Sequence, residues 1–83
     1  MSMIPVSVKR LFRILELPKH LQTTVLTLLK LGLATASEVS GPTGKARAVE
    51  SAYLNQLVVM KIICKERKGS KAFFRVDLEA LDW

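Results

Sequence analysis

Cysteine and histidine are nearly missing from this chain of 83 residues, which has one of each. A single cysteine, Cys64, cannot form an internal disulfide framework or a cysteine-based zinc site. His20 begins a predicted helix and has no cysteine or carboxylate at ligand spacing, so metal binding and histidine-based acid–base catalysis are not expected. Because no nucleophile, base and orienting residue form a set, we expect neither an enzyme nor a cofactor.

Long apolar runs are also missing. The most apolar stretch, residues 26–33, is too short to span a bilayer. The wider segment around it is also too polar, since it contains Lys19, His20 and Lys30. The first residues contain no apolar core or cleavage site of a signal peptide. We therefore expect an intracellular, cytoplasmic and nucleoid-associated protein without a membrane partner. A membrane-surface role for a basic amphipathic helix over 7–17 is disfavoured because no aromatic belt accompanies it.

Acidic residues are few. Seven Asp and Glu stand against 13 Lys and Arg, which gives a net charge of +6 and a pI near 9.9. This balance favours polyanionic partners, nucleic acid first. Apolar residues make up 49% of the chain, enough for the packed core of a single domain over residues 1–83. For so short a chain, this apolar content also hints at self-association.

Helical periodicity predicts two helices in the amino-terminal part. Apolar residues at i, i+3, i+4 and i+7 predict a helix over 7–17, which Pro18 ends. A second helix is predicted over 19–31, with Gly32 as its left-handed C-terminal cap. The residues of the second helix that we expect to form its apolar stripe are Leu21, Val25, Leu28 and Leu29.

The middle of the chain predicts a short helix, a turn and a long helix. Thr35 and Glu38 form a capping-box pattern that opens a helix ending near Ser40. Because two glycines and a proline follow, residues 41–44 are predicted to form a turn. A long helix is predicted over 45–59. We assign Thr43 as its N-cap and the following residues to its inner side: Ala46, Val49, Ala52, Tyr53, Gln56 and Leu57.

Beyond residue 60 the pattern becomes that of strands. Residues 61–67 alternate loosely, 68–71 form a predicted turn, and 72–77 form a second strand, which together make a β-hairpin. Residues 78–83 are a short tail. Helices followed by a hairpin in this order are typical of a winged helix-turn-helix. The predicted fold class is therefore mainly α with a small β-hairpin (α+β), a winged helix-turn-helix with an additional N-terminal helix.

Five stretches carry a further resemblance: VLTLLKLG at 25–32, TASEV at 35–39, KARAVESAYLNQL at 45–57, the Ile62-Ile63 pair and the basic hairpin around Lys68-Gly69-Ser70. Together they resemble the winged helix-turn-helix domains of small archaeal and bacterial regulators of the broad MarR and ArsR-like type. The resemblance implies a core over 18–77, a recognition helix over 45–59 and a wing over 61–77. Lys61 departs from the pattern, which commonly has glycine at that position.

Positive charge is concentrated in the predicted wing. Lys45 and Arg47 add a basic pair at the amino end of the recognition helix, where free N–H groups already attract phosphate. The acids Asp77, Glu79 and Asp82 gather instead in the tail. Between residues 61 and 75, only Glu66 opposes six basic residues: Lys61, Lys65, Arg67, Lys68, Lys71 and Arg75.

We therefore predict a double-stranded DNA-binding protein that acts as a transcriptional regulator. Helix 45–59 would enter the major groove and wing 61–77 would follow the backbone or minor groove. Arg47 can bond guanine and Asn55 adenine, whereas Glu50, expected on the same exposed face, would accept from cytosine or pair with Arg47. The predicted DNA-binding residues are Lys45, Arg47, Ser51, Asn55, Lys65, Arg67, Lys68, Lys71 and Arg75.

The additional N-terminal helix predicts a homodimer, because an extra terminal helix can pair two winged-helix subunits and so set the spacing of two half-sites. The alternative is that this helix covers its own core. The predicted interface residues are Val8, Leu11, Phe12 and Leu15, with Trp83 as a further participant. No small-molecule ligand is indicated.

A second class of function stays open: a winged-helix module for protein–protein interaction in a larger transcription, replication or division assembly. Fold alone does not choose between the two classes. The charge of the wing favours DNA, since a protein-binding module has little need for six basic residues in fifteen.

Overall fold

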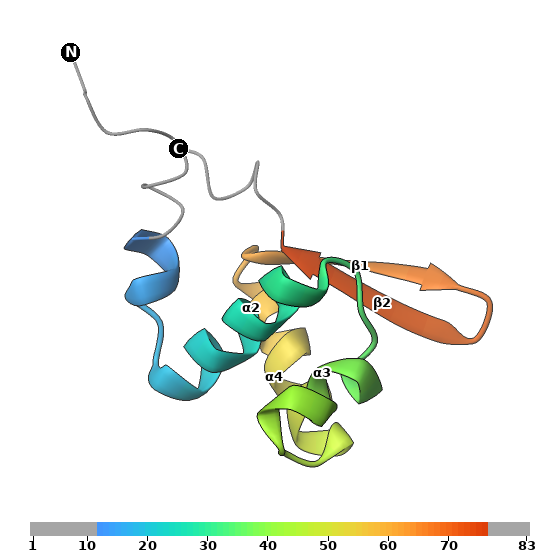
Figure 1. Ribbon diagram of the computed structural model, residues 1–83. Helices are drawn as coiled ribbons and strands as arrows, with labels where there is room; N and C mark the ends of the chain where they lie inside the picture. Colours follow the sequence, from blue (N-terminus) through green and yellow to red (C-terminus); the bar gives the residue numbers. More distant parts are fainter. Residues whose placement is uncertain (1–11, 77–83) are drawn as a thin grey trace.

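Helices followed by a two-stranded antiparallel hairpin make up residues 12–76, the part of the chain that the computed structural model describes (Figure 1). A helical turn over 12–15 comes first. The elements that follow are α2 (Lys19–Leu31), α3 (Ala36–Thr43), α4 (Arg47–Val59), β1 (Ile63–Lys68) and β2 (Lys71–Val76). This order confirms the predicted mainly α chain with a small β-hairpin.

Helix α2 has the predicted bounds. Pro18 is its N-cap, with its carbonyl accepting from the N–H of Gln22 at 2.9 Å. Gly32, at φ 81°, ends the helix and donates its N–H to the carbonyl of Leu28. The predicted stripe is wrong at Leu29, which is 41% exposed, because the buried face is centred one position earlier and takes in Thr24. The buried residues of α2 are Leu21, Thr24, Val25 and Leu28.

Helix α3 begins with the predicted capping box. The N–H of Glu38 donates to Thr35 Oγ1 at 3.2 Å, and the N–H of Thr35 donates to Glu38 Oε1 at 2.9 Å. The predicted end near residue 40 and the turn over 41–44 are wrong, because α3 continues through Pro42 to Thr43. Proline fixes a φ that suits a helix and costs the backbone one hydrogen bond. Gly44, left-handed at φ 73°, then ends the helix.

Helix α4 starts at Arg47, two residues later than predicted, with Ala46 as its N-cap. Thr43 is not the N-cap; it is the last residue of α3, and its hydroxyl accepts from the N–H of Lys45 at 3.4 Å. The predicted inner side is also largely wrong, because the buried face of α4 includes a charged residue that hydrophobic patterning passes over. The buried residues are Glu50, Leu54 and Leu57, whereas Ala46, Val49, Ala52 and Gln56 are exposed and Tyr53 is half-buried.

The hairpin is tighter than predicted. Lys68 pairs with Lys71, so Gly69 and Ser70 alone make the turn, and Gly69 takes φ 62°. The strands run over 63–68 and 71–76, whereas the sequence predicts 61–67 and 72–77, since residue 61 still belongs to the turn after α4. There Lys61 adopts the left-handed φ of 62°, the conformation that a glycine takes without strain.

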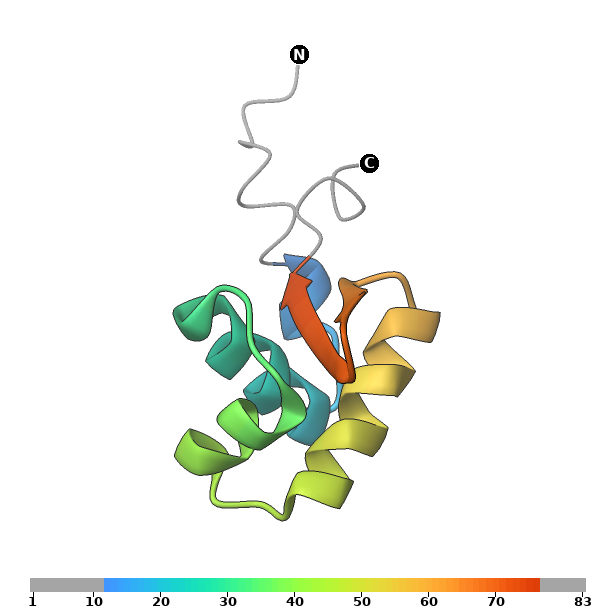
Figure 2. The ribbon, with the colours of Figure 1, turned by 90° about the vertical axis from the view of Figure 1, so that its right-hand side faces the viewer.

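The hairpin lies across one end of the helical layer. In Figure 2, α2 and α3 stand on one side of it and α4 on the other. Ala34, in the link between α2 and α3, exchanges two backbone hydrogen bonds with Phe74 of β2, at 3.0 and 2.7 Å. This bridge fixes the hairpin to the helices. The core beneath it includes Val25, Leu28, Val39, Leu54, Leu57, Ile62, Ile63 and Phe74.

Candidate nucleic-acid interface

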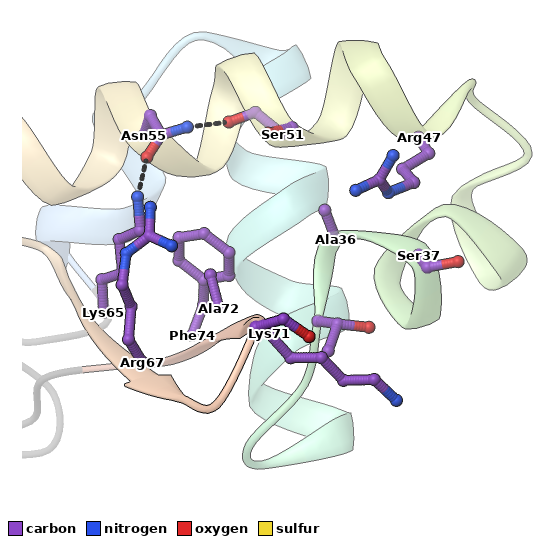
Figure 3. Close-up of a pocket in the computed structure, with 12 residues that line it drawn as sticks. Ala36, Ser37, Arg47, Ser51, Asn55, Lys65, Arg67, Lys71, Ala72 and Phe74 are labelled. Carbon is purple, nitrogen blue, oxygen red and sulfur yellow. Dashed lines mark hydrogen bonds between the residues drawn. The ribbon is translucent and has the colours of Figure 1, made fainter.

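A cleft of about 530 Å³ opens between α4, the amino end of α3 and the hairpin (Figure 3). We call it the wing cleft. Its lining residues are Thr35, Ala36, Ser37, Arg47, Ser51, Asn55, Lys65, Arg67, Ser70, Lys71, Ala72 and Phe74. They include six of the nine residues predicted to bind DNA, namely Arg47, Ser51, Asn55, Lys65, Arg67 and Lys71.

Two regular spacings bring these side chains together. Arg47, Ser51 and Asn55 are four residues apart along α4, so they lie on one face of the helix. Lys65 and Arg67 are two residues apart along β1, so they lie on one face of the hairpin. Both faces line the wing cleft, as Figure 3 shows. The recognition helix and the wing therefore present one continuous surface.

A chain of hydrogen bonds links the wing to α4 across the cleft. Lys65 Nζ donates to Asn55 Oδ1 at 3.1 Å, and Asn55 Nδ2 donates to the carbonyl oxygen of Ser51 at 2.9 Å (Figure 3). The same ammonium group lies 5.8 Å from the centroid of the Phe74 ring, within the distance at which a cation and a ring attract each other.

The wing cleft is strongly basic. Arg47, Lys65, Arg67 and Lys71 line it, and its lining includes no acidic residue. Glu50, which the sequence places on this exposed face, is fully buried, so that prediction is wrong. Glu50 contacts α2 instead, where Thr24 Oγ1 donates a hydrogen bond to Glu50 Oε1 at 2.7 Å.

Three of the predicted DNA-binding residues lie outside the wing cleft. Lys45 Nζ stands 5.2 Å from the centroid of the Tyr53 ring. Lys68 is exposed at the end of β1, beside the hairpin turn. Arg75 is on the other face of the hairpin from Lys65, and its Nε forms an ion pair with Glu66 Oε1 at 3.3 Å.

Hydroxyl groups complete the cleft, and the sequence-based prediction omitted them. Thr35, Ser37 and Ser70 all line it. Ser and Thr hydroxyls are frequent phosphate ligands in protein–DNA complexes. The capping box of Thr35 and Glu38 could have predicted part of this group, because it marks the amino end of α3 and so places Thr35 and Ser37 there.

The N-terminal helix falls only partly within the described residues. Ile14 and Leu17 are buried in the core, so this segment covers its own domain. Phe12 and Leu15, two of the predicted dimer residues, are each 52% exposed. The other predicted participants, Val8, Leu11 and Trp83, lie outside the described residues.

Residues 12–76, the part of the chain that the structure describes, lack two further features. Within that range, no three His, Cys, Asp or Glu side chains are grouped so that they could hold a metal ion. None of the helices there has the length and apolar character needed to cross a membrane.

No protein-family model matches the chain. An uncharacterized protein of Archaeoglobus fulgidus is 39% identical over 59 residues, which cover 71% of this chain and 80% of that protein.

Two solved structures share the fold. The AntR antimony-specific transcriptional repressor superposes with a TM-score of 0.67 at 21% identity, covering 98% of this chain and 77% of AntR. The homodimeric winged helix-turn-helix DNA-binding domain of Mb0332 from Mycobacterium bovis, a possible ArsR-family transcriptional regulator, gives 0.65 at 21% identity, covering 89% and 68%. These similarities confirm the predicted winged helix-turn-helix fold.

Proposed function

The chain belongs to the family of the Archaeoglobus fulgidus protein and has an ArsR-like winged helix-turn-helix fold, and on this premise we propose that it is a double-stranded DNA-binding transcriptional regulator. The observation that carries the proposal is the wing cleft. It joins the exposed face of α4 to the basic face of the hairpin, with Arg47, Lys65, Arg67 and Lys71 in its lining. Of the two structural neighbours, AntR is described as a transcriptional repressor and Mb0332 as a possible transcriptional regulator.

In this proposal α4 enters the major groove. Arg47, Ser51 and Asn55 then face the base edges, where arginine pairs bidentately with guanine and asparagine with adenine. Arg67 and Lys71 follow the sugar–phosphate backbone or minor groove, together with Lys68 at the hairpin turn. The hydroxyls of Thr35, Ser37 and Ser70 add hydrogen bonds to phosphate oxygens.

The proposal includes a homodimer. The Mb0332 domain is described as homodimeric, and Phe12 and Leu15 leave half of their surface exposed next to buried Ile14 and Leu17. A two-fold axis near this segment would present two copies of α4 to half-sites about one turn of DNA apart.

Fluorescence anisotropy with a labelled duplex tests DNA binding. We expect the wild-type chain to bind duplex DNA at low salt, and Arg67→Met to bind more weakly and with a smaller salt dependence. Lys30→Met is the matched control, because Lys30 is exposed on α2 and is not part of the wing cleft. Equal losses in the two variants would contradict the assignment of the interface to the wing cleft.

A protein-interaction module is the second candidate, and one observation favours it. A smaller groove of about 320 Å³ lies at the end of α2, lined by Leu29, Gly32, Leu33, Arg75 and Val76. Its three large apolar residues could accept an apolar partner segment. Absence of any duplex binding at low salt would favour this candidate over the regulator.

A further inference from the structure

The ammonium group of Lys65 is held from two directions. It donates to Asn55 Oδ1 at 3.1 Å, and it lies 5.8 Å from the centroid of the Phe74 ring. That ring is only 2% exposed, and its backbone exchanges two hydrogen bonds with Ala34. Lys65 is therefore supported by a fixed part of the core, although its own side chain is exposed.

The two partners of Asn55 determine how its amide is turned. An ammonium group can only donate, so the oxygen of the amide must face Lys65. A backbone carbonyl can only accept, so the nitrogen must face Ser51, as the 2.9 Å bond requires. Turning the amide over would set an N–H against the ammonium group and an oxygen against the carbonyl. The side chain thus has one favoured orientation before any ligand binds.

This orientation leaves the amide with unused hydrogen-bonding capacity. An asparagine amide has two N–H donors and two oxygen lone pairs, and the two bonds use one of each. One donor and one acceptor remain on an exposed residue of the helix face that lines the wing cleft. A donor and an acceptor are what a bidentate contact with adenine N7 and N6 requires.

We propose that Lys65 is a positioning residue, which fixes the Asn55 amide so that Asn55 reads an A·T base pair in the major groove. Base preference at one position of the DNA site then depends on a residue of the wing as well as on the recognition helix. This inference rests on the proposed function. It assigns Lys65 a role different from that of Arg67 and Lys71, whose expected contacts are with phosphates.

The two roles differ in what a substitution does. Loss of a phosphate contact weakens binding to all sequences alike, whereas loss of a base contact relaxes preference at one base pair. Lys68 provides a matched control for Lys65, because it carries the same charge on the same strand and does not line the wing cleft. Methionine at either position removes the charge and keeps an unbranched side chain.

The experiment has two stages. Duplexes bound by the wild-type chain are first selected from a random pool. Affinities are then measured for two duplexes. One is the recovered site, and in the other G·C replaces the A·T pair at which Asn55→Ala loses its base preference. The variants are Asn55→Ala, Lys65→Met, Lys68→Met and the double variant Asn55→Ala/Lys65→Met, each checked for native circular dichroism.

We expect the wild-type chain to prefer A·T at that position by about 5- to 100-fold. Asn55→Ala and Lys65→Met should each reduce this preference strongly, and the double variant should lose no more than either single one. Lys68→Met should weaken binding to both duplexes equally and keep the preference.

Two results would overturn the inference while leaving DNA binding intact. In the first, Lys65→Met behaves as Lys68→Met does, which would make Lys65 a phosphate contact. In the second, no A·T position depends on Asn55. If no duplex is bound at all, the proposed function itself fails, and that outcome is distinct from the other two.

Discussion

Thr24 Oγ1 lies 2.7 Å from Glu50 Oε1, and both side chains are fully buried where α2 meets α4. The second carboxylate oxygen, Glu50 Oε2, is buried and has no hydrogen-bond partner among the described residues. A buried carboxylate with one good hydrogen bond is costly to the fold, and it is more costly still if that bond is removed.

Thr24→Val is expected to destabilise the fold. Valine has nearly the same shape but leaves Glu50 without its hydroxyl partner, which should lower the free energy of unfolding by about 2–4 kcal/mol. Thr23→Val is the matched control: Thr23 is exposed, and its hydroxyl bonds the carbonyl of Lys19 one turn back on the same helix. Urea unfolding followed by circular dichroism measures both. Similar midpoints for the two variants would show that the buried pair contributes little.

Glu50→Met is expected to stabilise the fold. Methionine fills a similar volume without burying an unpartnered oxygen, and Thr24 can still donate to the carbonyl of His20, at 3.2 Å. We expect a gain of about 1 kcal/mol or more in the free energy of unfolding. The same variant should also abolish most of the cost of Thr24→Val when the two are combined. A loss of stability in Glu50→Met alone would contradict this explanation.

Lys61→Gly is expected to stabilise the turn between α4 and β1. Lys61 is held at φ 62°, a conformation that costs a residue with a Cβ about 1–2 kcal/mol. Glycine removes that cost. Part of the gain in stability, about 0.5–1 kcal/mol, is lost again because glycine makes the unfolded chain more flexible. The melting temperature should therefore rise by a few degrees. Lys61→Ala, which keeps the Cβ, serves as the control and should melt close to wild type.

Phe12 and Leu15 provide a test of the homodimer. Both are 52% exposed, so replacing them together by serine should preserve the monomer fold and separate the subunits. Val59→Ser is the control, because Val59 is 80% exposed at the end of α4. Sedimentation at tens of micromolar should show a monomer for the double variant and a dimer for wild type and control. A wild-type monomer would refute the dimer.

The sequence predicted well what depends on neighbouring residues. The capping box of Thr35 and Glu38, the C-cap at Gly32 and the bounds of α2 all follow from contacts within a few positions. The basic character of the hairpin also followed directly, because the six basic residues between positions 61 and 75 are opposed there by Glu66 alone.

Contacts between distant residues were beyond local patterns. The sequence predicts Glu50 on the DNA-binding face because nothing near it indicates a buried partner. That partner, Thr24, is 26 residues away, and no helical spacing relates the two. The bond between Lys65 and Asn55 likewise depends on how the hairpin folds back over α4. Pro42 led to a different error. A proline usually ends a helix, but α3 includes Pro42 and continues to Thr43, with Gly44 as its C-cap.

In the proposed function, basic residues of the hairpin bind phosphates of the DNA backbone, so the affinity for duplex DNA should depend strongly on salt concentration. If Arg67, Lys68 and Lys71 each neutralise one phosphate, the logarithm of the association constant should fall with the logarithm of salt concentration with a slope of about −3 for each bound chain. Arg67→Met should make that slope less negative by about 0.9. A wild-type slope near zero would contradict phosphate binding by the hairpin.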